Sequence, residues 1–309
     1  MTETFVPRTE EGAFVRAVSE FRHWVTADGA AGPSGEGGFE AASGRYHLYV
    51  SYACPWANRT LIMRTLKGLE SHIDVSVVHP LMGPESWHFD DSYPGATVEP
   101  LFGAHLMAEV YRRANAHFDG VVTVPALWDR ERATLVSNES SEIIRMFNRA
   151  FDGITGNRDD YYPDALRAEI DRWNERIYHT VNNGVYRAGF ATTQTAYANA
   201  VGELFDTLDV LEAHLAERSF LVGDSLTEAD IRLFPTLIRF DAVYVTHFKC
   251  NVRRLVDFPA LQAYTERLYA LPGVAETVRF DHIKDHYFQS HRSINPTGIV
   301  PVGPELAFR

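Results

Sequence analysis

The chain has 309 residues, of which 45% are hydrophobic and 23% charged, the composition of an ordinary globular protein with one large domain or two ordinary ones. Its formal charge of −12 argues against a surface for nucleic acid or anionic membranes, although a few local cations could still hold a small anionic ligand. No apolar run approaches ~18 residues and the N-terminus lacks a secretory pattern, so we expect no membrane span.

Residues 1–44 are predicted to form an N-terminal extension. Their glycine-rich segment, residues 29–38, has too much glycine for a helix or a central strand. It also lacks the preceding strand and the closing Lys-Ser/Thr of a phosphate-binding loop, so we interpret it as a surface loop. Ahead of it, Phe14, Phe21 and Trp24 are placed to lay the extension over the main body.

Cys54 lies where a strand is predicted to turn into a helix. Residues 46–50 are β-branched and aromatic and predict a buried strand, and residues 60–66 predict a helix. Pro55 suits the first helical position, because it has no N–H to leave unpaired and its φ is already helical. The N–H groups and the positive end of this helix would stabilise a nucleophilic thiolate on Cys54. The alternative is that Cys54 is a small buried hydrophobe, but a packing cysteine does not require this arrangement.

A mixed disulfide on Cys54 must be resolved from elsewhere. Ala57 stands where a second cysteine of a local dithiol would be, which rules out a local disulfide. Cys250 is the only other cysteine; it could resolve Cys54 in principle, but we expect it to be structural. A soluble thiol such as glutathione is the simpler source. Two cysteines cannot build a disulfide framework, and we expect a reducing, cytoplasmic location.

The elements that follow have the order of a thioredoxin-like domain, assigned to residues 45–155. They are a strand at 73–79, a long connection at 80–120 with a short helix near 103–116, a hairpin at 121–128 and 134–137, and a helix at 139–151. The strand, helix and strand around Cys54 imply parallel pairing with a right-handed crossover.

Pro125 has a specific place in this order. Ahead of a strand and close to a reactive cysteine, such a proline is typically cis, which leaves the N–H and C=O of Val124 free to pair with a peptide ligand. A trans proline at a strand start is the alternative interpretation.

Residues 156–280 are predicted to form an all-helical domain. Apolar residues step by three and four along residues 166–181 and 197–215, which indicates two long amphipathic helices. Thr227, with Asp230 at the third helical position, predicts a variant of the capping box. A further helix is predicted at residues 259–271.

Residues 281–309 are rich in proline and glycine towards their end and are predicted to form an extended tail packed on the helical domain. Within this region His282 and His286 have the i, i+4 spacing of a helical metal site, but no glutamate stands between them as in His-Glu-x-x-His. We therefore expect no metal.

Five stretches carry a family resemblance: residues 52–57 (Tyr-Ala-Cys-Pro-Trp-Ala), 181–191, 230–241, 245–251 and 286–291. With the Val-Pro strand and the Glu-Ser pair that opens the helix at residue 139, they resemble glutathione transferases. More narrowly, they look like the glutathionyl-hydroquinone reductases, also called Xi-class transferases. The similarity covers nearly the whole chain.

The resemblance implies a two-step thiol exchange. Cys54 attacks the sulfur of a glutathionyl-hydroquinone, and a second glutathione then releases glutathione disulfide. It also implies a glutathione site in which the γ-glutamyl end lies at the Glu-Ser pair; the residues are Trp87, Val124, Pro125, Glu139 and Ser140. Arg59 and Arg239 are further candidates for pairing with an anion. The family typically forms homodimers, which we carry over as an expectation.

Tyr186 and Tyr287 match the two family tyrosines that reach the quinone oxygens. Attack on the sulfur of an aryl thioether would expel an aryl carbanion, whereas prior tautomerisation to the keto form makes the departing carbon an enolate. That step needs hydrogen-bond donors at the ring oxygens and a proton route, and phenols can supply both. The alternative is that both tyrosines simply fill the helical bundle.

Two other functions remain open at this point. An omega-like thiol transferase acting on dehydroascorbate or mixed disulfides would keep Cys54 but need neither Tyr186 nor Tyr287. A non-catalytic glutathione-transferase-like module would bind a protein partner and show no affinity for glutathione.

Overall fold

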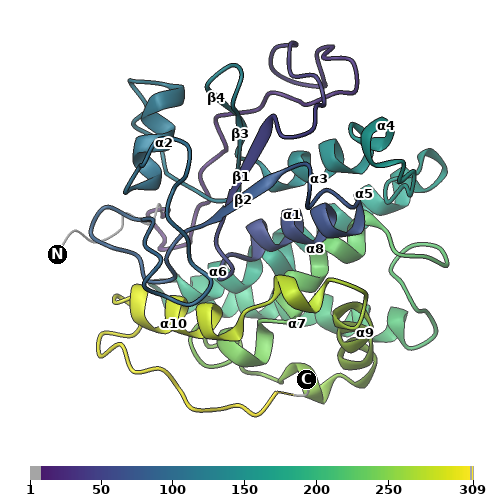
Figure 1. Ribbon diagram of the computed structural model, residues 1–309. Helices are drawn as coiled ribbons and strands as arrows, with labels where there is room; N and C mark the ends of the chain where they lie inside the picture. The colour runs from purple at the N-terminus through teal and green to yellow at the C-terminus, as the bar shows by residue number, and fades with distance from the viewer. Residues whose placement is uncertain (1–7, 307, 309) are drawn as a thin grey trace. The chain divides into compact units, whose positions relative to one another are not determined.

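The computed structural model describes residues 8–306 and 308 (Figure 1). By its internal contacts the chain divides into two compact units. Unit 1 contains Val18–Asp160 and Glu276–His282, and unit 2 contains residues 8–17, Tyr161–Ala275 and the chain from Ile283 onward. The N-terminal extension is thus divided: its first described part belongs to unit 2 and the rest to unit 1.

Unit 1 is built on a four-stranded mixed sheet with the order β2-β1-β3-β4. The strands are β1 (Tyr46–Val50), β2 (Asp74–Val77), β3 (Ala126–Asp129) and β4 (Thr134–Ser137). β1 pairs in parallel with β2 and antiparallel with β3, and β3 pairs antiparallel with β4. Every residue of the two central strands, β1 and β3, is buried, which explains their nearly continuous apolar sequences.

The helices of unit 1 are α1 (Pro55–Leu66), α2 (Met107–Ala114), α3 (Ser140–Arg149) and the single turn α4 (Asp152–Thr155). α1 and α3 pack against each other, and α2 packs near β4 (Figure 1). The predicted strand, helix and strand, the short helix in the long connection and the hairpin are confirmed. Several predicted bounds were too wide. β3 begins at Ala126 rather than at residue 121, because residues 121–124 pair with no strand in the described part of the chain. β2 and α2 are also shorter than predicted.

The N-terminal extension covers the outer edge of the sheet. The His23 N–H donates to the Val136 carbonyl at 2.8 Å, and Arg22 forms an antiparallel bridge with Ser137 of β4. The Phe21 ring packs edge-on against Tyr111, with 5.7 Å between centroids. Residues 18–44 of the extension therefore lie on unit 1, and they pair part of an edge strand that would otherwise be open.

Unit 2 is helical. Its elements are η1 (Asp164–Leu166), α5 (Arg167–Ile177), the π-helical η2 (Tyr178–Asn182), α6 (Gly184–Gly189), α7 (Gln194–Leu215), α8 (Glu228–Leu237), the π-helical η3 (Phe240–Tyr244), η4 (Leu255–Asp257) and α9 (Pro259–Tyr269). The predicted cap is confirmed, because the Asp230 carboxylate accepts the Thr227 N–H at 2.8 Å. No helix in the described part of the chain is both long enough and apolar enough to cross a membrane.

The prediction of an extended tail from Asp281 was wrong for its first part. The chain forms η5 (Ala275–Thr277) and then α10 (Phe280–Ser290), which begins in unit 1 and continues in unit 2. The helical stretch contains no proline or glycine and buries Ile283, Tyr287 and Phe288 at helical spacing. The proline-rich composition belongs only to the residues after it.

Candidate active site

Cys54 is the N-cap residue of α1. Its backbone is extended, with φ −77° and ψ 120°, and Pro55 occupies the first helical turn as predicted. The Cys54 carbonyl accepts the Asn58 N–H at 3.0 Å, which is the first bond of the helix. The side chain is half-buried, and Sγ donates to the Val124 carbonyl at 3.3 Å. The sulfur therefore lies at the positive end of a helix, where negative charge is favoured.

The Val124-Pro125 peptide bond is cis, which confirms the sequence prediction. The prediction that the Val124 carbonyl is free was wrong, because it accepts a hydrogen bond from Sγ of Cys54. The Val124 N–H donates to no acceptor within residues 8–306 and 308. Tyr111 fixes the preceding residue: its hydroxyl donates to the Thr123 carbonyl at 2.9 Å and accepts the Thr123 N–H at 3.3 Å. The Val124 N–H is thus a backbone donor in a fixed position beside the cysteine.

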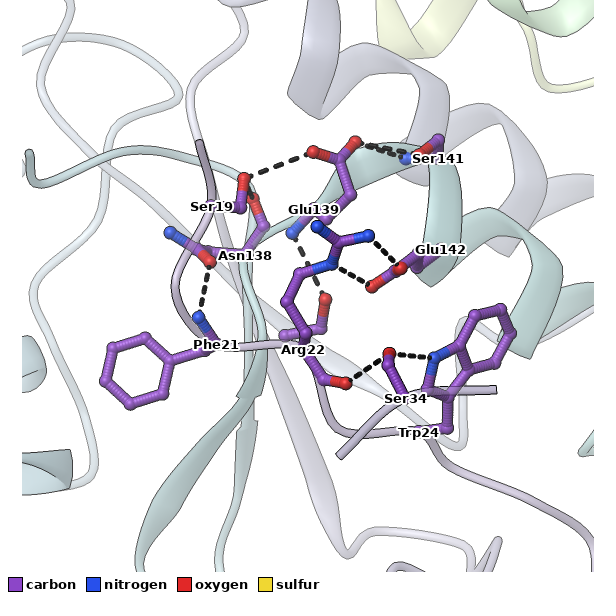
Figure 2. Close-up of polar contacts among 10 residues, drawn as sticks. Ser19, Phe21, Arg22, Trp24, Ser34, Asn138, Glu139, Ser141 and Glu142 are labelled. Carbon is purple, nitrogen blue, oxygen red and sulfur yellow. Dashed lines mark hydrogen bonds and ion pairs between the residues drawn. The ribbon is translucent and has the colours of Figure 1, made fainter. Parts of the chain in front are cut away.

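Ser140 is the first residue of α3, and Glu139 is its N-cap. Figure 2 shows the Glu139 carboxylate beside Ser141. Oε1 of Glu139 accepts the Ser141 N–H at 3.0 Å and the Ser141 hydroxyl at 2.8 Å. Burial raises the pKa of Glu139, but the Ser141 hydrogen bonds, the charge of Arg59 and the Ser19 hydroxyl together leave that pKa below its ordinary value. Glu139 is therefore a carboxylate that can face an ammonium group.

Arg59 provides a cation next to this pair. It is buried at 3% exposure, and Nη1 donates to the Ser140 hydroxyl at 3.4 Å. Its guanidinium lies 4.5 Å from the ring centroid of Trp56. A carboxylate, a hydroxyl, a buried guanidinium and a helix N-terminus thus meet in one place, which suits the paired charges of an α-amino acid group.

Ser19 contacts the candidate site residue Glu139, a contact that the sequence did not predict. Its hydroxyl lies 3.1 Å from Oε2 of Glu139 and 3.3 Å from the Asn138 carbonyl (Figure 2). The neighbouring Phe21 N–H donates to Oδ1 of Asn138 at 3.2 Å, and Arg22 forms a two-bond ion pair with Glu142. A single serine in an extension carries no sequence signal for this contact, because its partner is 120 residues away.

Trp87 lies in the long connection between β2 and α2. It is 7% exposed, and its carbonyl accepts the Met107 N–H at 3.0 Å. Its position over a bound peptide stays a prediction.

Three tyrosine hydroxyls form a chain in unit 2. Those of Tyr186 on α6 and Tyr287 on α10 lie 2.5 Å apart, and that of Tyr244 at the end of η3 lies 3.0 Å from Tyr287. Tyr186 is half-buried, whereas the other two are 1% exposed or less. Burial raises the pKa of both Tyr244 and Tyr287 well above the ordinary value, partly opposed by the charge of the buried Arg239. Tyr186 and the central Tyr287 were predicted from the sequence, whereas Tyr244 at the inner end was not.

Cys250 is fully buried, and its Sγ lies 3.8 Å from the Phe248 carbonyl. Burial raises the pKa of the Cys250 thiol, which makes it a poor nucleophile. This agrees with the structural role expected for it. Within residues 8–306 and 308, no group of three or more histidine, cysteine or acidic side chains has the geometry of a metal site.

Comparison with known proteins identifies the family. Residues 53–150 match the family described as glutathione S-transferase, N-terminal domain, and residues 194–267 match its C-terminal domain. The chain is 58% identical to the glutathionyl-hydroquinone reductase YqjG of Escherichia coli over 95% of its length and 89% of that protein. It is 52% identical to the glutathionyl-hydroquinone reductase PcpF of Sphingobium chlorophenolicum over 96% of this chain and 91% of that protein.

Solved structures support the same family assignment. The glutathione-bound structure of YqjG from Escherichia coli superposes with a TM-score of 0.92 and covers 93% of each chain. The Xi glutathione transferase of Phanerochaete chrysosporium, 50% identical, also gives a TM-score of 0.92 and covers 96% of this chain and 95% of that one. The predicted fold, a thioredoxin-like domain followed by a helical glutathione-transferase domain, is confirmed. The chain therefore belongs to the glutathione transferases and, within them, to the Xi class of glutathionyl-hydroquinone reductases.

Proposed function

We propose that this protein reduces glutathionyl-hydroquinones to hydroquinones, with glutathione as co-substrate and a mixed disulfide between Cys54 and glutathione as the intermediate. One observation carries the proposal. In a chain 58% identical to a glutathionyl-hydroquinone reductase, a half-buried cysteine caps a helix, with its sulfur 3.3 Å from the carbonyl that precedes a cis proline.

The reaction begins with the ring. A proton moves from a ring hydroxyl to the carbon that bears sulfur, which gives the keto tautomer. The Cys54 thiolate then attacks the glutathione sulfur. An S–S bond forms, and the C–S electron pair passes to the ring carbon as an enolate, which takes a proton on oxygen to become the hydroquinone. The aryl carbon has gained two electrons, and the two sulfurs have lost them.

A second glutathione completes the cycle. Its thiolate attacks the glutathione sulfur of the mixed disulfide, Cys54 departs as a thiolate, and glutathione disulfide is released. The proton lost by this glutathione balances the one taken up by the enolate. Cys250 has no part in this step, because its thiol is fully buried.

The geometry of unit 1 supports a specific set of residues for glutathione. We propose that the Val124 N–H pairs with a peptide carbonyl, and that Pro125 fixes the direction of that N–H. The γ-glutamyl ammonium pairs with the Glu139 carboxylate, and the γ-glutamyl carboxylate lies at the Ser140 hydroxyl and the Arg59 guanidinium, which are 3.4 Å apart. Trp87 covers the peptide.

Tyr186 and Tyr287 serve the ring oxygens in this proposal. Their hydroxyls lie 2.5 Å apart and share a hydrogen bond. In the row of three hydroxyls, the half-buried Tyr186 is the end nearer to solvent and the buried Tyr244 is the other end. Such a chain donates hydrogen bonds to an enolate and carries a proton, which are the two requirements of tautomerisation.

The test is a turnover assay with a glutathionyl-hydroquinone and glutathione, in which released hydroquinone and glutathione disulfide are both quantified by chromatography. We expect equal amounts of the two products from wild type and from Cys250→Ala, and none from Cys54→Ser. Cleavage of mixed disulfides or dehydroascorbate without cleavage of the thioether would replace this function with a general thiol transferase. No glutathione binding at all would leave a non-catalytic module.

We further propose a homodimer that works in the reducing cytoplasm, where free glutathione is available. Light scattering on the purified protein should give twice the chain mass of 34.9 kDa. A mass equal to one chain would contradict the dimer without affecting the chemistry.

A further inference from the structure

The first described residues of the chain form a short turn that is fixed to unit 2. The Thr192 N–H donates to the Gly12 carbonyl at 3.1 Å, and the Thr193 hydroxyl donates to the Glu11 carbonyl at 2.9 Å. Gly12 has φ +83°, and a Cβ at this position would lie 2.4 Å from Oγ1 of Thr192. Only glycine fits, so the turn is held closely against the start of α7.

This turn brings Arg16 over the ring of Tyr186. Cζ of Arg16 lies 4.8 Å from the Tyr186 ring centroid and 5.4 Å from that of Phe14. Nε of Arg16 donates to Oδ1 of Asn183 at 2.8 Å, which fixes the guanidinium one turn before Tyr186 on the same helical segment. Phe14 also stacks on Phe190, with centroids 5.7 Å apart, so both residues of the turn are held by the α6 region.

A guanidinium in this position acts on the tyrosine electrostatically. It is attracted by the electron-rich face of the ring, and the attraction grows as the phenol oxygen gives up its proton and the ring gains negative charge. Arginine suits this role better than lysine, because it stays protonated and its planar group can stack while Nε holds Asn183. The hydroxyl of the same tyrosine lies 2.5 Å from that of Tyr287, so a change in the χ1 angle of Tyr186 would move its hydroxyl away from that hydrogen bond.

We propose that Arg16 is a positioning residue for Tyr186: it holds the ring in register with Tyr287 and stabilises the charge that Tyr186 develops when it transfers a proton to or from the hydroquinone ring. The inference rests on the proposed function. It assigns a role in the reaction to the N-terminal extension, a segment outside both matched domains at residues 53–150 and 194–267.

The experiment compares two substrates of the same cysteine. A glutathionyl-hydroquinone needs tautomerisation before Cys54 can react, whereas the mixed disulfide of glutathione and 2-mercaptoethanol presents a good leaving thiolate and needs no phenol. For Arg16→Leu we expect kcat for the thioether to fall about tenfold, which corresponds to about 1.4 kcal/mol of barrier. KM for glutathione and kcat for the disulfide should stay within about twofold of wild type.

Three further variants make the result specific. Arg16→Lys keeps the charge but not the planar stack and should recover part of the lost kcat. Asn183→Ala keeps Arg16 but removes its anchor and should give an intermediate kcat. Arg8→Gln removes one positive charge from an exposed position in the same turn and should behave as wild type.

Each outcome decides the question. Equal losses with both substrates would mean that Arg16 only supports folding, and no rescue by Arg16→Lys would mean that its positive charge does not assist Tyr186. Either result would overturn the proposal. An Arg16→Leu enzyme with wild-type thioether kcat would overturn it as well, while the proposed function stands. A wild-type protein that never cleaves the thioether would remove the proposed function and this inference together.

Discussion

The hydroxyl oxygen of Ser19 lies 3.1 Å from Oε2 of Glu139, across 120 residues of sequence (Figure 2). Glu139 caps α3, and its Oε1 accepts hydrogen bonds from the N–H and the hydroxyl of Ser141. The N-terminal extension thus holds one face of the carboxylate, and α3 holds the other. This contact makes the extension part of the proposed glutathione site.

Ser19→Ala should weaken glutathione binding about fivefold, because a hydrogen bond to a charged group that orients the ammonium partner is lost. The measurement is calorimetric titration in the Cys54→Ser background, which excludes mixed-disulfide formation. Ser34→Ala is the matched control: it breaks the Ser34 hydrogen bonds to Trp24 and the Arg22 carbonyl in the same extension without touching Glu139. Equal effects of the two variants would refute a specific role for Ser19.

Glu139→Gln should remove a pH-dependent part of the protein's stability. The folded-state pKa of Glu139 is lowered, so the unfolded chain binds the proton more readily, at about pH 4.3. The stabilisation is therefore complete above that pH and is lost as the pH falls through the lower folded-state pKa. In urea unfolding, the unfolding free energy of wild type should exceed that of Glu139→Gln at neutral pH, and this difference should become smaller in acid.

Glu85→Gln, at an exposed position, is the control for this measurement and should change the unfolding free energy by less than about 0.5 kcal/mol. If the difference in unfolding free energy between wild type and Glu139→Gln stays constant or grows as the pH falls, the folded protein does not stabilise Glu139 as a carboxylate.

Tyr186→Phe and Tyr287→Phe should each lower kcat for a glutathionyl-hydroquinone about 100-fold, with a much smaller change in KM, because both act on the ring during proton transfer. Tyr244→Phe removes only the innermost of the three hydroxyls and should lower kcat less than the other two substitutions. Steady-state kinetics checks this, with Tyr269→Phe on α9 as the control. Wild-type turnover in the Tyr186→Phe/Tyr287→Phe double variant would contradict the proposed role of both.

A thiol titration with a chromogenic disulfide should find one reactive cysteine in the native protein and two after unfolding. Cys250 is fully buried with a raised pKa, so it should react only once the chain unfolds. Cys54→Ser should abolish the native reaction, and Cys250→Ala should leave it unchanged. Two native thiols reacting at similar rates would reopen a resolving role for Cys250.

The parts of the fold that sequence predicted depend on local rules. The run Tyr46–Val50 and Pro55 define a strand, a corner and a helix within a few residues, and Thr227 and Asp230 define a cap within one turn. The cis bond before Pro125 followed from the element order. The strand, the corner, the helix and the cap needed no knowledge of distant contacts, whereas the cis bond also relied on the domain order that brings Pro125 close to Cys54.

The parts that sequence missed depend on tertiary contacts. Ser19 contacts a residue 120 positions away, and Arg16 bonds to one 167 positions away, with no periodicity or motif to connect either pair. Tyr244 is distinguished from the other tyrosines only by lying 3.0 Å from Tyr287. α10 was missed because the prolines beyond Ser290 dominated the composition of the segment.

A single-turnover experiment tests the central claim most directly. Mixing the protein with excess glutathionyl-hydroquinone, without free glutathione, should release one hydroquinone per chain and leave one glutathione on Cys54, located by peptide mass spectrometry. Adding glutathione should then restore the free thiol and yield glutathione disulfide. Hydroquinone release that is undiminished in Cys54→Ser, or that leaves Cys54 unmodified in wild type, would contradict the mechanism.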